Sequence, residues 1–215
     1  YHVIVRTNIK RNIRESEYTN NAKYSSNKIN IDIPVLPLNV QISDTLEGNG
    51  RHYYKVEVPS NLDLRITAAT SNNVPVFDVY ASFGQIPTLS SYNYKSDEKI
   101  SIGQADLSKE VFIPSTQSGW YYILLRSSSA YAIQGYSIIA ETLSFSLASI
   151  TPSKGGRGGH VTTILQGAGF RDSTRVFLYR SGEKMTEGQV RRLNSSMEMM
   201  VRWDLADVAL GTYDI

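Results

Sequence analysis

Apolar and polar residues alternate with a period of two along most of the chain. Residues 53–58 read Tyr-Tyr-Lys-Val-Glu-Val, which places Tyr54, Val56 and Val58 on one side. Successive side chains of an extended chain point to opposite faces, so such a run predicts a strand with one buried face. Comparable runs cover residues 1–6, 62–68, 74–81, 111–114, 120–126 and 136–141. The pattern predicts an all-β protein.

Turn-forming residues separate these runs. Glu47-Gly48-Asn49-Gly50, Ser71-Asn72-Asn73 and Ser118-Gly119 are the clearest examples. Asn and Gly tolerate left-handed backbone angles, so they favour tight turns. Strands with turns every 8 to 12 residues or so are typical of a β-sandwich or barrel. Residues 104–109 and 181–190 leave a short helix open as an alternative.

Breaks in composition divide the chain. Residues 20–30 are rich in Asn, Ser and Lys and precede Pro34 and Pro37, while Pro152 introduces the Gly-rich run 155–159. Proline stiffens an extended backbone and glycine frees it, a composition typical of linkers and domain starts. We therefore expect three modules joined by short, semi-rigid connections. Their expected ranges are 1–33, 34–146 and 147–215.

The first module contains the run Tyr1 to Val5, then Glu15-Ser16-Glu17 and Asn20-Asn21. This order resembles the tail of the bacterial cell-adhesion-related domain (CARDB). The resemblance implies that residues 1–33 are the C-terminal strands of a CARDB-like sandwich followed by a linker.

The second module opens with Leu46 to Val56 and continues with Phe77 to Tyr80, Ser118 to Leu125 and Tyr136 to Ile138. It resembles a bacterial pre-peptidase C-terminal (PPC) domain, which implies a jelly-roll-like sandwich over residues 34–146. Some relatives hold calcium through clustered carboxylates. Here only Asp44, Glu47 and Asp78 are available, so calcium stays an alternative, and we expect no other cofactor.

The third module begins with Ile150 to Gly156, Gly158 to Thr162 and Gln166 to Phe170. It resembles an IPT/TIG immunoglobulin-like domain. Gly167 and Gly169 permit a kink or bulge before Phe170 enters the core. Because the chain stops within the strand that normally closes this fold, we expect residues 147–215 to lack one edge strand. The expected architecture is thus tandem β-sandwiches, a jelly-roll-like one followed by an immunoglobulin-like one.

No set of catalytic residues stands out. The chain has no cysteine, and its three histidines lack zinc-binding spacing. The Gly-rich run 155–159 lacks the Gly-Lys-Ser/Thr ending of a phosphate-binding loop, and no Gly-x-Ser-x-Gly elbow occurs. We expect His52 in a turn and His160 in solvent. The sequence predicts a protein that is not an enzyme and has no catalytic or metal-binding residues.

Charge and hydropathy exclude two classes of partner. The formal net charge is +2 and the basic residues are scattered, whereas nucleic-acid binding requires a dense cationic patch. No segment approaches the roughly 18 apolar residues of a membrane span. We therefore expect neither nucleic-acid binding nor membrane insertion, and the resemblances imply a secreted or cell-surface location.

Aromatic residues supply the candidate contacts. Tyr92, Tyr94 and Tyr131 lie in the second module, together with Tyr80 and Phe83. Exposed tyrosines stack on sugar rings or anchor a protein partner. The alternative is that Tyr92 and Tyr94 cap the core of the sandwich from a loop.

These resemblances imply a non-catalytic segment of a large multidomain protein. We expect it to act as a spacer, in adhesion or in presenting a substrate. One alternative is an accessory region that targets a secreted peptidase or glycanase to an insoluble matrix, and another is a structural region of a surface fibre or filament. The expected partners are the neighbouring domains, a protein or polysaccharide matrix, and other copies of the chain.

Overall fold

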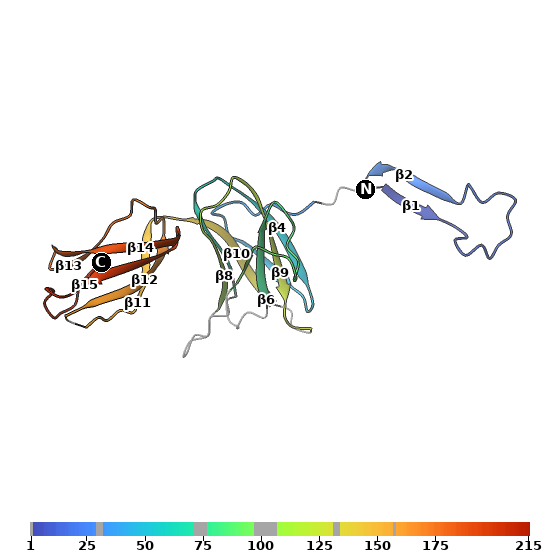
Figure 1. Ribbon diagram of the computed structural model, residues 1–215. Coiled ribbons are helices and arrows are strands. Elements are labelled where there is room, and N and C mark those ends of the chain that lie inside the picture. The colour runs from blue at the N-terminus through green and yellow to red at the C-terminus, as the bar shows by residue number, and fades with distance from the viewer. Residues whose placement is uncertain (1, 29–31, 71–76, 97–106, 131–133, 157) are drawn as a thin grey trace. The chain divides into compact units, whose positions relative to one another are not determined.

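The chain folds into strands and turns, as the sequence predicts. The computed structural model describes residues 2–28, 32–70, 77–96, 107–130, 134–156 and 158–215, and these form strands β1 to β15 without a helix (Figure 1). The chain divides into two compact units, Tyr1–Pro34 and Val35–Ile215. The all-β fold class is therefore confirmed.

The first unit is a two-stranded hairpin. Strand β1 (His2–Arg6) pairs antiparallel with β2 (Ala22–Lys28), with Arg6 opposite Ala22. Val3, Ile4 and Val5 are all exposed. Two strands alone offer no second layer against which a face can be buried, so the alternating apolar side chains among the described residues of this unit stay exposed.

The second unit begins with a β-sandwich, here called the middle sandwich (residues 35–143). Its two four-stranded antiparallel sheets have the orders β3-β10-β5-β8 and β4-β9-β6-β7. The first sheet consists of β3 (Ile42–Leu46), β10 (Gln134–Leu143), β5 (Asp63–Ala69) and β8 (Ser108–Ile113). The second consists of β4 (Arg51–Val58), β9 (Gly119–Ser127), β6 (Phe77–Phe83) and β7 (Tyr94–Lys95).

The core of the middle sandwich lies between the two sheets. The predicted apolar face of β4 (Tyr54, Val56 and Val58) is buried, and it belongs to the same cluster as Leu64 and Ile66 of β5. Burying one large apolar side chain stabilises a fold by about 1.5–3 kcal/mol. This cluster is therefore the main source of stability of the middle sandwich.

The remaining strands form one five-stranded antiparallel sheet, here called the C-terminal sheet (residues 146–215). Its order is β11-β12-β15-β14-β13. The strands are β11 (Ser146–Thr151), β12 (His160–Ala168), β15 (Glu198–Asp204), β14 (Glu183–Ser195) and β13 (Val176–Arg180). Trp203, Val201 and Phe170 are buried in its core.

The helical alternatives are wrong where the structure describes them. Most of residues 181–190 belong to β14, which pairs with β13 on one side and β15 on the other. Two ladders of backbone hydrogen bonds outweigh the weak local helix preference. Of residues 104–109, only 107–109 are described, and Ser108 already begins β8.

The glycines of the Gln166 to Phe170 motif allow a close backbone approach. A Cβ on Gly167 would lie 2.0 Å from the carbonyl oxygen of Ser146, and Gly169 has φ +75°. Only glycine adopts that angle without steric cost. The chain turns here, and Phe170 enters the core as expected.

Candidate binding surface

The loop between β6 and β7, residues 84–93, is held closely to the sandwich. Gly84 N–H donates to the carbonyl of Trp120 at 2.9 Å, and Asn93 N–H donates to that of Ala81 at 3.1 Å. The side-chain Oδ1 of Asn93 accepts the N–H of Phe83 at 3.0 Å. Both ends of the loop are therefore fixed by hydrogen bonds to strands.

The middle of the same loop is also tied to itself. Thr88 N–H donates to the carbonyl of Ser91 at 2.8 Å, and Ser91 N–H donates back to Thr88 Oγ1 at 3.0 Å. Pro87 is buried and anchors the turn. The loop thus has a defined conformation before any partner binds.

This fixed loop exposes apolar side chains. Ile86 is 53% exposed, Leu89 40% and Tyr92 41%. We call these three residues the apolar loop triad. Loops on a rigid scaffold are common carriers of binding residues, and exposed apolar groups are what a partner can bury.

Tyr92 packs against Tyr80, which itself has charged neighbours. Its ring meets that of Tyr80 edge-on, with centroids 5.1 Å apart. Lys95 Nζ lies 5.6 Å from the Tyr80 ring centroid and 3.9 Å from Asp78 Oδ2. Burial raises the pKa of Tyr80, and the Asp78 charge raises it further, partly offset by Lys95 and Arg126. The Tyr80 hydroxyl thus stays protonated and donates toward Asp78.

The three predicted contact tyrosines have different outcomes. Tyr92 is exposed, whereas Tyr94 lies half-buried in β7 and packs against the core cluster. Burial raises the pKa of Tyr94, with a further contribution from Tyr121. Tyr131 lies outside the described residues. Tyr92 thus has the position expected of a contact residue and Tyr94 that of a core cap; ligand binding by either stays a prediction.

The prediction missed Ile86 and Leu89. They flank Pro87 in a stretch otherwise rich in Gly, Ser and Thr, and apolar residues within a turn-forming composition were the available signal. Alternation did not mark them, because the segment forms no strand.

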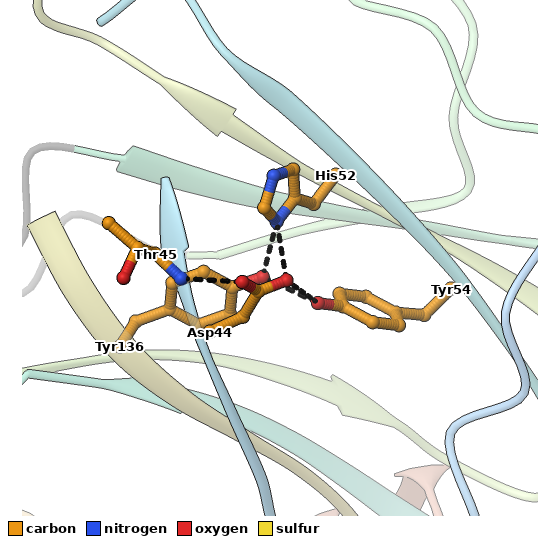
Figure 2. A network of polar contacts seen from close by, with 5 residues as sticks. All are labelled: Asp44, Thr45, His52, Tyr54 and Tyr136. Atoms are coloured by element: carbon orange, nitrogen blue, oxygen red, sulfur yellow. Dashed lines mark hydrogen bonds and ion pairs between the residues drawn. The ribbon is translucent and has the colours of Figure 1, made fainter. Parts of the chain in front are cut away.

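The second feature of the middle sandwich is a group of polar side chains that connects its two sheets. Figure 2 shows the side chains of Asp44 from β3, His52 and Tyr54 from β4, and Tyr136 from β10 directed toward one another. His52 Nδ1 lies 2.7 Å from the Tyr136 hydroxyl, which lies 2.6 Å from the Tyr54 hydroxyl. Tyr54 in turn donates to Asp44 Oδ2 at 3.4 Å. We call these four residues the tyrosine network.

The protons of the tyrosine network have one consistent order. The Tyr54 hydroxyl donates its one proton to Asp44 Oδ2, so the Tyr136 hydroxyl is the donor in the bond between the two tyrosines. His52 Nδ1 lies 2.7 Å from the Tyr136 hydroxyl and 3.3 Å from Asp44 Oδ2, so the tautomer that carries its proton on Nδ1 satisfies both contacts. Burial raises the pKa of Tyr136 well above its usual value, and burial together with the Asp44 charge raises that of Tyr54. Both phenols are therefore neutral hydrogen-bonding groups.

The network corrects one expectation about the histidines. His52 lies within β4 and is half-buried, not in a turn, because Gly50 closes the turn and Arg51 already begins the strand. His160 is exposed, as expected, at the start of β12, with Nε2 3.4 Å from Asp204 Oδ2.

Two of the three carboxylates considered for calcium make different contacts, and the third, Glu47, is exposed. Asp44 belongs to the tyrosine network, and Asp78, in the other sheet, faces Lys95. Across the described parts of the chain, no three His, Asp or Glu side chains gather as a metal site would require. Among the residues that the structure describes, there is also no helix that is long and apolar enough to cross a membrane.

A cleft of about 520 Å³ opens on the C-terminal sheet. Val161, Leu178 and Trp203 line the sheet side, and residues 208–213 line the other. Asp214 and Tyr179 exchange backbone hydrogen bonds of 2.8 and 2.9 Å, which hold that last segment against β13. The lining has the character of an apolar core face covered by a single segment.

No family model matches the chain, and no curated protein matches it. The solved structures similar to it include the pre-peptidase C-terminal domain of a collagenase from Bacillus anthracis, at 14% identity, 53% of this chain, 99% of that chain and a TM-score of 0.41. They also include PliG of Aeromonas hydrophila, a periplasmic inhibitor of g-type lysozyme, with 14% sequence identity and a TM-score of 0.39. That match covers 51% of this chain and 96% of PliG. A third is CorA of Methylomicrobium album BG8, a surface-associated copper-binding protein, with 7% sequence identity and a TM-score of 0.35. That match covers 50% of this chain and 97% of CorA. The likeness thus covers about half of this chain.

Proposed function

We propose that the chain is a non-catalytic binding module of a secreted or cell-surface multidomain protein, and that the apolar loop triad is its contact surface. The observation that carries this proposal is the exposure of Ile86, Leu89 and Tyr92 on a loop that hydrogen bonds fix in advance. A preformed loop loses little conformational entropy on binding, so most of the burial energy of the triad is available for affinity.

The composition of the triad favours a protein partner over a polysaccharide. Sugar rings stack on flat aromatic faces, and only Tyr92 supplies one. Ile86 and Leu89 are aliphatic and gain most from burial against apolar side chains, at about 25 cal/mol per Å² of apolar surface removed from water. The proposed role is adhesion to an insoluble protein matrix. The same proposal takes residues 1–33 as CARDB-like and residues 147–215 as IPT/TIG-like modules on either side of the middle sandwich.

The test is retention of the purified chain on insoluble fibrillar collagen and, separately, on crystalline cellulose. We expect the unaltered chain to be retained on collagen, and the triple variant Ile86→Ser, Leu89→Ser, Tyr92→Ser to lose most of that affinity. An anchor residue contributes more than about 1 kcal/mol, so three of them correspond to a loss of roughly a hundredfold.

The matched control is Tyr24→Ser, because Tyr24 is 71% exposed and meets the His2 ring edge-on, much as Tyr92 meets Tyr80. Equal retention of the triple variant and the unaltered chain would show that the loop is not the contact surface. Retention on cellulose alone would favour the polysaccharide alternative. No retention on either matrix would favour the spacer role.

A further inference from the structure

Asp63 is a buried carboxylate at the edge of the middle sandwich. It is the first residue of β5, only 4% exposed, and stands opposite Leu143, the last residue of β10. Its Oδ1 accepts the N–H of Ser115 at 2.9 Å. The sandwich therefore supplies one donor to this side chain and places it where the chain leaves for β11.

The other donors to Asp63 come from the C-terminal sheet. Gly169 N–H donates to Oδ2 at 2.6 Å, and the Ser196 hydroxyl donates to Oδ1. Gly169 follows β12, and Ser196 lies between β14 and β15. These two loops are tied together, because Phe170 N–H donates to the carbonyl of Ser196 at 2.8 Å.

The energetics make this contact more than incidental. Burying a carboxylate costs several kcal/mol unless hydrogen bonds replace its water. Among the described residues no Lys, Arg or His forms an ion pair with Asp63, so its three neutral donors carry that compensation. Two of the three would be lost if the C-terminal sheet moved away, and the carboxylate would then need water in their place.

The receiving backbone is shaped for a close approach. Gly169 has φ +75°, and a Cβ there would lie 3.0 Å from Phe145 Cα. Phe145, which lies between β10 and β11, meets the ring of Phe170 edge-on with centroids 6.3 Å apart. The glycine thus brings its N–H to Asp63 and lets the connecting segment pass beside it.

We propose that Asp63 is a latch that fastens the C-terminal sheet to the middle sandwich, so that the two modules move as one body. The latch partner is the pair of loops that carries Gly169 and Ser196. This inference stands apart from the proposed function, because it concerns how modules are held and not what they bind. It assigns a role to the Gln166 to Phe170 motif beyond turning the chain.

The absence of cysteine makes a direct test practical. Paired spin labels at Glu57→Cys and Lys184→Cys, one exposed site in each module, report the inter-module distance by pulsed electron paramagnetic resonance. We expect one narrow distance distribution in the otherwise unaltered chain, and loss of that narrow maximum in Asp63→Asn and in Ser196→Ala. Ser196→Ala leaves the middle sandwich untouched, so it tests the latch even if Asp63→Asn weakens the fold.

Ser149→Ala is the matched control, since it removes a hydroxyl that bonds only within the C-terminal sheet, to Gln166 Oε1 at 3.2 Å. Its distribution should stay narrow. A broad distribution in the unaltered chain, or narrow distributions in both latch variants, would overturn the proposal.

Discussion

Tyr136→Phe is the most informative single change in the middle sandwich. The substitution removes one oxygen and keeps the ring, which contacts Phe77 edge-on at 5.9 Å between centroids. The apolar packing therefore stays. What is lost is the hydroxyl that bonds His52 at 2.7 Å and Tyr54 at 2.6 Å.

The magnitude follows from the groups left behind. Tyr54 is only 4% exposed, so its oxygen loses a donor and has little access to water, while its own proton keeps the 3.4 Å contact with Asp44. His52 is half-buried and can recover a partner from solvent. Leaving one buried polar group unsatisfied costs about 1–3 kcal/mol. We expect a loss of about 2 kcal/mol in the free energy of unfolding.

The assay is urea denaturation followed by tyrosine and tryptophan fluorescence. The control is Tyr53→Phe, a neighbouring half-buried tyrosine of β4 outside the tyrosine network, for which we expect a change below about 0.5 kcal/mol. A Tyr136→Phe variant as stable as the control would refute the reasoning, because it would show that the buried hydroxyl is not needed by its neighbours.

Two further predictions concern the same sandwich. Folding raises the pKa of both Tyr54 and Tyr136, so the unfolded state loses these protons first as the pH rises. The free energy of unfolding should therefore fall above pH 10 by up to about 1.4 kcal/mol per pH unit for each tyrosine. Urea denaturation at pH 9 and 11 measures this decline, and a variant with both tyrosines changed to phenylalanine should show a flatter one. Ile66→Ala should cost about 2–5 kcal/mol because Ile66 is fully buried in the core cluster, whereas Phe112→Ala, at a 38% exposed site on the neighbouring strand, should cost clearly less in the same assay; equal losses would contradict the assigned core.

The strands of the middle sandwich were predictable because their pattern is local. Tyr54, Val56 and Val58 alternate with polar residues, and a strand with one buried face is the only regular structure with that period. The expected turn at Asn49 is confirmed for the same reason, since its φ of 56° suits Asn.

The candidate sites were less predictable because their partners are distant in sequence. His52 bonds a tyrosine 84 residues away, and nothing in its neighbours indicates that. Asp63 meets Gly169 and Ser196 across 106 and 133 residues. An acid within an alternating run looks like a solvated residue until the element that buries it is known. Exposure of Ile86 and Leu89 likewise depends on Pro87, which turns inward.

The tyrosine network and the Asp63 latch use buried polar groups in a chain that has no disulfide to fix its edges. Apolar packing stabilises a sandwich but tolerates small shifts, whereas hydrogen bonds between buried groups fail when geometry changes. The two sites therefore differ in what a lost hydroxyl should do. The Tyr136 hydroxyl makes its bonds within the middle sandwich, so removing it should lower the stability of that sandwich. The Ser196 hydroxyl bonds between the two modules, so removing it should free their relative motion while each module keeps its core.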